Sequence, residues 1–526
     1  MPTMALSKIT AFIGRHPTVA LLALFLFHAM NNVILVGRDM APLTGDEAEY
    51  FWHGSFHLLA LKSGNIASFL SSPPYIMHPP LLRFVSIPFY LLFGYRPDIA
   101  ILSTLPALLV LIVSVYYIGK EMHSPQAGMF ACALTSLFPG IFTFSRTYFH
   151  DLTLAAAVAL SMALLIKTKG FTHMGYSVAF GASVGLGLLT KVPYVLFLVG
   201  PIVVCMWHSV RQCRGLSVRM SHANAKCLLL SFFIAGSLAF TWYASHLATN
   251  LEYAGPAIFR DASIIAFSPQ RFLRYIDVLY SQQLGPVFFV SSFIALGVLI
   301  NKKREFRLLA AWVLPPYLIF TLVVDQMFSR YTLPYLPAFA LLISLAVFGL
   351  SEPLPRWVAS FLLVVGVAQF LFISYLDAPI HPLDRMERGA STADTRNWKD
   401  SELVASLNTL LAHSTNPTIT TLELYIYSPG TLNYLMSLGQ LNQTHIYGIL
   451  PCEWEEPTRC GRGPEEYSRI LGEADIILDE DNIFSSLVPE SPLGEAWRGA
   501  SGMFAEAESI PLPDGRHLLI RRRLSG

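Results

Sequence analysis

Long apolar runs recur from the N-terminus to about residue 376 and are separated by short polar or basic stretches. Several of them reach the about 17–25 residues that a helix needs to cross a bilayer. We predict eleven membrane-spanning helices, at residues 17–37, 98–118, 125–145, 151–167, 174–189, 192–208, 227–247, 284–300, 308–324, 331–349 and 357–376. One further apolar run, Leu81–Gly94, is short and contains Pro88. We interpret it as part of an outer loop, 38–97, whose helices lie along the membrane interface.

The distribution of lysine and arginine predicts which ends of these helices face the cytoplasm, because short cytoplasmic loops carry an excess of both residues. The basic clusters are Lys8/Arg15, Lys167/Lys169, Arg211/Arg214/Arg219/Lys226 and Lys302/Lys303/Arg304/Arg307. Placing all of them in the cytoplasm leaves an even number of crossings between each pair. Eleven crossings then put the N-terminus inside and the C-terminal region outside. A second long outer loop is predicted at 248–283.

The pattern changes after residue 377, where charged residues become frequent and long apolar runs cease. We therefore divide the chain into a membrane domain, 1–377, and a soluble extracytoplasmic α/β domain, 378–526. Helical periodicity marks 402–413, strand patterns mark 418–427 and 474–478, and 509–522 resembles a hairpin. Cys452 and Cys460 could form a disulfide in an oxidising compartment, or remain two thiols.

Composition supports a multi-pass membrane protein. The chain is 53% hydrophobic and 13% charged, with a mean hydropathy of +0.50, whereas soluble proteins contain roughly 25% charged residues. The net charge of +1 argues against a nucleic-acid partner. The sequence contains no phosphate-binding P-loop, no Gly-rich dinucleotide motif and no His-Glu-x-x-His zinc motif, so nothing indicates the use of a soluble nucleotide.

A dense acidic cluster, Gly45-Asp46-Glu47-Ala48-Glu49-Tyr50, follows the first predicted span. Carboxylates beside hydrocarbon are costly to desolvate, so they often mark a functional site. Thr44, Asp46 and Glu47 would also make an ordinary helix start with capping acids. Position alone favours neither interpretation.

Other polar residues fall on the same predicted outer face. Asp151 stands at the mouth of the fourth span, Lys191 lies in a tight turn between two spans, and Arg330 precedes the tenth. Lysine and arginine on the outer face are contrary to the usual excess of these residues in cytoplasmic loops. Each could simply extend its charged group to the lipid headgroups, or the two could bind an anion such as phosphate. Because two acidic sites lie on the same predicted face, we favour anion binding over contact with the lipid headgroups.

This combination of groups suggests a reaction. A carboxylate can deprotonate an acceptor hydroxyl as a general base, and cations can stabilise the charge on a departing phosphate. A sugar attached to a lipid phosphate would be delivered from the bilayer itself. Such a donor requires no nucleotide site.

Five motifs, in this order, resemble the GT-C superfamily of polyprenyl-phosphate-sugar-dependent glycosyltransferases, and most closely its protein O-mannosyltransferase and lipid A aminoarabinose transferase branch. The motifs are Gly45–Tyr50, His78-Pro79-Pro80-Leu81, Tyr148–Leu152, Leu189-Thr190-Lys191 and Arg330–Pro337. They cover the membrane half of the chain, and the C-terminal domain is similar only in general layout.

The resemblance implies an inverting transferase that faces the periplasm or lumen. By motif position, Asp46 matches the catalytic carboxylate of the family and Asp151 matches its second acidic site. Glu47 also matches the motif, and its role could be in catalysis, helix capping or orientation of the loop. Lys191 and Arg330 match the ligands of the lipid phosphate, and His78 is a further phosphate-contacting candidate.

One motif departs from the family pattern. Aminoarabinose transferases have an acid and a lysine before the Pro-Pro pair, whereas this chain has Met77 and His78. The missing acid weakens the case for a metal site like theirs. His53 and His57 are four residues apart and share a helical face, which suits a zinc pair but is more typical of an aromatic-rich interfacial helix. We predict no metal ligand and no cofactor, with a divalent metal as the alternative.

The sequence thus predicts an enzyme of the bacterial inner membrane that transfers a sugar from a polyprenyl-phosphate donor to an extracytoplasmic lipid, glycan or protein. Membrane lipids are its other expected partners. The alternatives are a lipid-pyrophosphate-dependent oligosaccharide transferase or ligase, a secondary transporter, and a transferase-like scaffold without activity.

Overall fold

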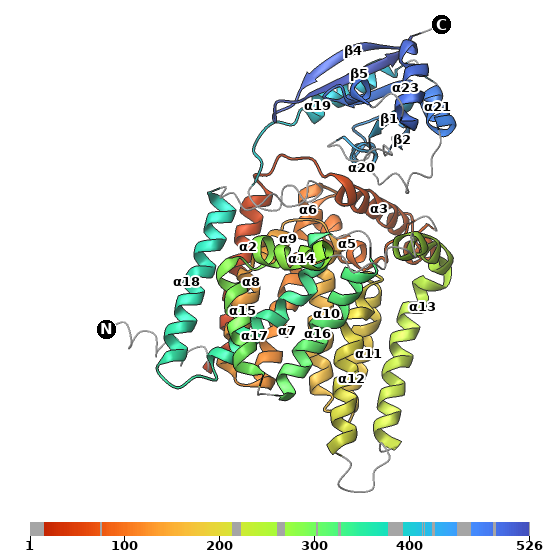
Figure 1. Cartoon of the computed structure of the whole chain (residues 1–526). Coiled ribbons are helices and arrows are strands. Elements are labelled where there is room, and N and C mark those ends of the chain that lie inside the picture. The colour runs from red at the N-terminus through yellow and green to blue at the C-terminus, as the bar shows by residue number, and fades with distance from the viewer. Residues whose placement is uncertain are drawn as a thin grey trace. The chain divides into compact units, whose positions relative to one another are not determined.

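The computed structural model divides into two compact units (Figure 1). It describes residues 15–73, 76–212, 222–259, 269–300, 303–324, 328–376, 393–412, 414, 416–422, 427–449, 464–487 and 491–524. The first unit comprises residues 1–37, 57–89 and 100–392, and the second comprises 38–56, 90–99 and 393–526. Cys452 and Cys460 lie outside the described residues, so their predicted pairing stays a prediction.

The first unit is a bundle of long apolar helices. Within the described residues, seven helical segments are long and apolar enough to cross a membrane: Pro17–Val36, Pro97–Met122, His150–Lys167, Asn224–Asn250, Glu305–Leu322, Ser329–Val347 and Leu354–Tyr375. Four shorter apolar helices are Leu81–Phe93, Met174–Leu188, Tyr194–Trp207 and Pro286–Leu299. Each of the eleven predicted spans coincides with helical structure, and the protein is a multi-pass helical membrane protein.

The helices that form the bundle are α2 (Pro17–Val36), α7 (Leu105–Met122), α8 (Pro125–Leu137), α9 (Pro139–Phe144), α10 (His150–Lys167), α11 (Met174–Leu188), α12 (Tyr194–Gln212), α13 (His222–Phe259), α15 (Pro286–Leu299), α16 (Lys303–Leu322), α17 (Leu336–Val347) and α18 (Leu354–Tyr375). Several of them expose large apolar side chains, such as Phe233 at 71% and Val364 at 68%. Contiguous apolar surface of this kind is stable against lipid rather than water.

One detail of the predicted spans was wrong. The predicted span 125–145 is not one helix, because Phe138 is extended between α8 and α9. Pro139 lacks an N–H and disfavours the helical conformation of the residue before it. In the predicted outer loop 248–283, the described residues 248–259 and 269–283 are helical, and the side of the membrane on which they lie stays a prediction. The loop contains the end of α13, α14 (Pro269–Val278) and a π-helical turn, Leu279–Gln283.

Close backbone contact joins α7 to α8. A Cβ atom on Gly128 would lie 2.3 Å from the Tyr116 carbonyl oxygen and 2.8 Å from the Lys120 nitrogen. A Cβ on Gly119 would lie 2.7 Å from the Gly128 Cα. Small residues let membrane helices approach closely, which gains dispersion contacts that lipid cannot supply. These glycines therefore set the distance between the two helices.

The second unit contains a five-stranded mixed sheet in the order β2-β1-β3-β5-β4. Its strands are β1 (Thr418–Leu422), β2 (His445–Ile449), β3 (Ile476–Glu480), β4 (Phe504–Pro511) and β5 (His517–Arg523). The first three strands are parallel, and β3–β5 and β5–β4 are antiparallel. Helices α19 (Asp400–Leu410), α20 (Pro429–Ser437), α21 (Pro464–Glu473), α22 (Ile483–Ser486) and α23 (Pro492–Ala500) complete the domain.

The predicted α/β class and terminal hairpin of this domain are confirmed. Within the predicted strand 418–427, β1 covers Thr418–Leu422, and residues 423–426 lie outside the described residues. All five residues of β1 are buried rather than alternating. A central strand of a parallel sheet is covered on both faces, so its residues do not alternate between core and solvent.

The compact units also differ from a division at residue 377. Segments 38–56 and 90–99 belong with the C-terminal domain. Helix α3 (Gly45–Lys62) therefore begins in the second unit and ends in the first. The Asp46 cluster and the C-terminal domain form part of one folded unit.

We expect Gly128→Val to destabilise the protein by about 1–3 kcal/mol, because the added methyl groups would overpack the α7–α8 contact. Thermal unfolding of the purified protein in detergent tests this expectation. Gly297→Val in α15 is the control, since a Cβ there meets no atom within 4 Å. Equal unfolding midpoints for the two variants would contradict the proposed packing constraint.

Candidate functional site

Three charged side chains, distant in sequence, meet inside the first unit. Lys191 Nζ donates to both carboxylate oxygens of Asp151, at 3.0 and 3.2 Å. Arg330 Nε lies 3.7 Å from Asp151 Oδ2. The side chains of Asp151, Lys191 and Arg330 are only 1%, 9% and 3% exposed. Two cations converge on one carboxylate, so the three groups together carry one excess positive charge.

Each member is positioned by an interruption between helices. Asp151 lies in the first turn of α10, where the helix dipole favours a carboxylate. Lys191 lies in the turn between α11 and α12, where the Tyr194 amide donates to the Lys191 carbonyl at 3.1 Å. Arg330 is the second residue of the 3₁₀-helix η4 (Ser329–Tyr335), in which Pro334 removes one backbone donor.

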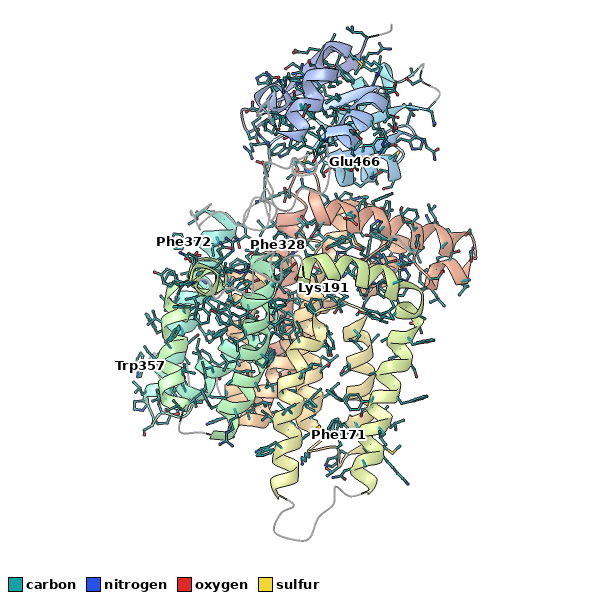
Figure 2. The ribbon with its side chains drawn as sticks, turned by 45° about the vertical axis from the view of Figure 1, so that its right-hand side comes forward. Phe171, Lys191, Phe328, Trp357, Phe372 and Glu466 are labelled. Atoms are coloured by element: carbon teal, nitrogen blue, oxygen red, sulfur yellow. The ribbon has the colours of Figure 1, made fainter. Side chains whose placement is uncertain are left out.

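Aromatic rings surround the two cations. The Arg330 guanidinium lies 4.1 Å from the Phe328 ring centroid and 4.9 Å from that of Phe149. Lys191 Nζ lies 5.0 Å from the Tyr331 ring. Cation–π contacts are strongest where water is excluded, so the rings stabilise both cations in their buried positions. Figure 2 shows Lys191 and Phe328 toward one end of the helix bundle.

The His78 motif adjoins this cluster. The rings of His78 and His150 are 5.5 Å apart. The Leu81 amide donates to the Leu189 carbonyl at 3.0 Å, which ties the start of α5 (Leu81–Phe93) to the Lys191 turn. The structure therefore brings together four of the five motifs singled out in the sequence: those of His78, Asp151, Lys191 and Arg330.

A second polar network, which the sequence analysis missed, lies on α3 and α5. Arg83 is fully buried and donates through Nε to His57 Nε2 at 3.2 Å and through Nη2 to the His78 carbonyl at 2.8 Å. His57 Nδ1 lies 2.9 Å from the Phe69 carbonyl, which assigns the proton to Nδ1. An arginine within the apolar run 81–94 was the available signal, because buried charges usually have a function.

The acidic cluster lies in the second unit. Asp46 and Glu47 occupy the first turn of α3, and Tyr50 Oη lies 3.4 Å from Asp46 Oδ2. Glu47 is 7% exposed, and Glu49 pairs with His53 at 3.7 Å. The helix start predicted for this cluster is confirmed, while its approach to the Asp151 cluster stays a prediction.

Among the described residues, no group of three or more His, Cys, Asp or Glu side chains is arranged to hold a metal ion. Both ring nitrogens of His57 are hydrogen-bonded within the protein. That arrangement disfavours the zinc pair considered for His53 and His57, because a metal ligand needs a free ring nitrogen.

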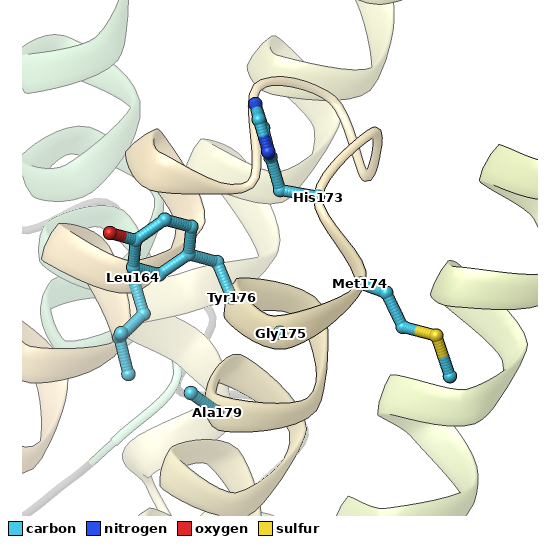
Figure 3. Close-up of a pocket in the computed structure, with 6 residues that line it drawn as sticks. All are labelled: Leu164, His173, Met174, Gly175, Tyr176 and Ala179. Carbon is cyan, nitrogen blue, oxygen red and sulfur yellow. The ribbon is translucent and has the colours of Figure 1, made fainter.

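A separate hollow of about 390 Å³ lies far from the charged cluster (Figure 3). Its lining residues are Leu164, His173, Met174, Gly175, Tyr176 and Ala179. Leu164 follows Asp151 by thirteen residues on α10, which corresponds to about 20 Å along a helix. The hollow is therefore not part of the cluster.

A match to a known protein family covers three of the motifs described above. A family model described as dolichyl-phosphate-mannose-protein mannosyltransferase matches residues 77–238, a stretch that includes His78, Asp151 and Lys191. No curated protein sequence matches the chain.

Solved structures resemble nearly the whole chain. ArnT from Cupriavidus metallidurans in the apo state is 14% identical, with a TM-score of 0.58 over 98% of both chains. ArnT bound to undecaprenyl phosphate gives a TM-score of 0.56 at 14% identity, over 96% of this chain and 97% of that one. The Archaeoglobus fulgidus oligosaccharyltransferase in the apo form gives 0.55 at 12% identity, over 88% and 70%.

The chain has the GT-C fold. This confirms the predicted fold class, a polytopic helical membrane protein followed by a smaller α/β domain. In this fold, the cluster of Asp151, Lys191 and Arg330 lies where helices of the bundle are interrupted, and buried polar backbone can be accommodated at such breaks.

We expect Asp151→Asn to destabilise the protein by about 3–5 kcal/mol, because it leaves two buried cations without their shared carboxylate. Asp151→Asn combined with Lys191→Met should be less destabilised than the sum of the single variants. Thermal unfolding of all three variants measures the coupling. The exposed pair Arg469–Glu473 is the control, and neutralising it should change nothing measurable. Additive effects at Asp151 and Lys191 would contradict the coupling.

We also expect a pH effect from His57. Burial and the neighbouring Arg83 lower the pKa of His57 from 6.5 to about 4, although the Phe69 carbonyl opposes the shift. Between these pH values only the unfolded chain takes up the proton, so stability falls as pH decreases from 6.5 to 4, by up to about 3 kcal/mol.

The unfolding midpoint should therefore fall less steeply in His57→Asn than in the wild-type protein as pH is lowered from 7 to 4.5. His445→Asn, which changes an exposed histidine, is the control and should retain the wild-type slope. An unchanged slope in His57→Asn would show that His57 is not the titrating group.

Proposed function

We propose that the protein is a membrane glycosyltransferase that moves a sugar from a polyprenyl-phosphate donor to an acceptor outside the cytoplasm. The observation that supports this most is the buried cluster in which Lys191 and Arg330 converge on Asp151 within a GT-C fold. Burying two cations beside Asp151 costs desolvation free energy, which favourable contacts must offset. The phosphate of a lipid-linked donor would add further favourable contacts with both cations.

Lys191 and Arg330 are the proposed phosphate ligands. Ammonium and guanidinium groups form short charge-assisted hydrogen bonds with phosphate oxygens. The ArnT structure with undecaprenyl phosphate shows that a chain of similar fold holds such a lipid. His78, whose ring lies near that of His150, is a further candidate for contact with the phosphate.

Asp151 then positions the cations rather than reacting. Lys191 donates to both of its oxygens, so the carboxylate is already engaged by a fixed cation. Asp151 would hold Lys191 and Arg330 in place when no donor is bound. This assignment favours a positioning role for Asp151 over the catalytic role that its motif implies.

Asp46 is the proposed general base. It would take the proton from the acceptor hydroxyl as that oxygen bonds to the anomeric carbon. The bond between the anomeric carbon and the phosphate oxygen breaks, and its electron pair leaves with the polyprenyl phosphate, whose charge Lys191 and Arg330 stabilise. Attack opposite the leaving group inverts the anomeric centre. Glu47, buried in the same helical turn, would orient the start of α3.

The proposal includes an orientation in the membrane. The basic clusters favour an N-terminus in the cytoplasm and a C-terminal domain in the periplasm or outside the cell. We assign the protein to the bacterial inner membrane, where polyprenyl-phosphate donors are presented on the outer leaflet. Acceptors then arrive from the side of the C-terminal domain.

We expect the proposed base and the proposed phosphate ligands to have separable effects. Asp46→Asn should reduce transfer at least about a hundredfold while donor binding stays intact, because general-base catalysis contributes about 10²–10⁴-fold. Lys191→Ala and Arg330→Ala should instead weaken the binding of polyprenyl phosphate. Purified variants in lipid nanodiscs, with transfer followed by mass spectrometry and lipid binding by titration, give both quantities.

Lys399→Ala removes a half-exposed cation of the C-terminal domain and is the control for nonspecific loss of positive charge. Retained turnover in Asp46→Asn would exclude Asp46 as the base. Unchanged lipid affinity in both cation variants would exclude the phosphate site. Release of a polyprenyl pyrophosphate as product would instead support the oligosaccharide transferase alternative.

A further inference from the structure

The N-terminal turn of α20 contacts the backbone that carries Asp46. Ser428 caps α20 and accepts a hydrogen bond from the Thr431 amide. The Thr431 hydroxyl donates to the Leu43 carbonyl at 3.0 Å, and both residues are buried. All of these residues belong to the second unit. A side chain of the C-terminal domain thus binds the peptide that leads into α3.

Gly430 brings the two backbones into direct contact. A Cβ atom there would lie 3.1 Å from the Gly45 carbonyl oxygen, 3.3 Å from the Ala48 Cβ and 3.4 Å from the Glu49 amide nitrogen. These three residues flank Asp46 on both sides. A side chain at this position would require the neighbouring atoms of α3 to shift by a few tenths of an ångström, because protein interiors leave little room for added groups.

Aromatic contacts extend the same interface along α3. The Phe51 ring is stacked on Tyr95, with centroids 4.2 Å apart, and meets the edge of Tyr434 of α20 at 5.9 Å. Tyr95 Oη donates to the Phe51 carbonyl at 2.7 Å. The contacts at Leu43, Gly45 and Phe51 fix both the start and the direction of this part of α3.

Sheet topology explains why α20 presents this surface. The chain leaves the carboxyl end of β1, forms α20 and returns as β2, whereas β3 lies on the other side of β1. Tyr427, just before α20, is hydrogen-bonded to both central strands. Its amide donates to Glu480 at the end of β3, and its carbonyl accepts from the Thr421 hydroxyl of β1. In open α/β sheets this switch point is where ligands bind. Here the residues next to it contact α3.

We propose that α20 is a positioning element for Asp46, with Gly430 and Thr431 as its positioning residues. The C-terminal domain would then act in the reaction by fixing the backbone of residues 43–49, besides any part it plays in binding the acceptor. The expected effect on catalysis rests on the proposed function. The contact between the two backbones does not depend on it.

The test compares Gly430→Val with Gly499→Val. Both glycines lie in helices of the C-terminal domain, but a Cβ on Gly499 meets no atom within 4 Å. We expect Gly430→Val to lower kcat about tenfold to hundredfold, because displacement of a catalytic group by about 1 Å has effects of that size. The donor KM should stay within twofold of the wild-type value. Gly499→Val should keep both constants.

Hydrogen exchange of the peptide covering residues 43–50, measured by mass spectrometry, supplies a readout that does not depend on turnover. Exchange there should be faster in Gly430→Val than in Gly499→Val. If Gly430→Val fails to fold, Thr431→Val replaces it, because this nearly isosteric change removes only the hydroxyl that binds the Leu43 carbonyl.

The outcomes separate the two proposals. Equal exchange and equal kcat in the Gly430 and Gly499 variants would overturn the positioning role. Faster exchange with unchanged kcat would also overturn it, since the contact would then be structural only. If the wild-type protein transfers no sugar, the proposed function fails, and the exchange comparison alone decides whether α20 holds this segment.

Discussion

The buried contact between Asp151 and its two cations is the constraint around which the membrane unit is organised. Removing charged groups from water costs several kcal/mol for each ion, and good geometry is needed to offset that cost. Three separate helix interruptions supply the geometry, at the start of α10, in the turn before α12 and in η4. The rings of Phe149, Phe328 and Tyr331 then exclude water from the cations. Such a site can exist only where several helices end together.

Interrupted helices also explain how an apolar protein can bring several charged side chains to one place. Continuous helices satisfy their own backbone groups and present side chains to lipid or to one another. Where the helices are interrupted, the backbone changes direction, and polar side chains from different helices can point toward one another. The proposed division of labour follows from this arrangement. In the proposed function, the first unit would hold the donor phosphate among fixed cations, and the second unit carries the carboxylate that would activate the acceptor. The contact between α20 and α3 links that carboxylate to the C-terminal sheet.

The sequence predicted several features well because their causes are local. Runs of apolar residues predicted every helical span, since crossing a bilayer requires only length and composition. The motifs around His78, Asp151, Lys191 and Arg330 predicted residues that prove to be neighbours. The break at Phe138 was missed although Pro139 indicated it, because apolar character continued across the proline. The alternation predicted for β1 was wrong, because a central strand is covered on both faces.

What the sequence by itself determined is the class of protein, its helices and the charged residues that had to be accounted for, because hydropathy and charge are properties of the residues themselves. Only the tertiary structure decided which charges meet. It showed that Lys191 and Arg330 share Asp151, that Arg83 binds His57, and that the Asp46 segment folds with the C-terminal domain. These contacts join residues tens to hundreds of positions apart. Their energies depend on burial and distance, which a linear pattern does not contain.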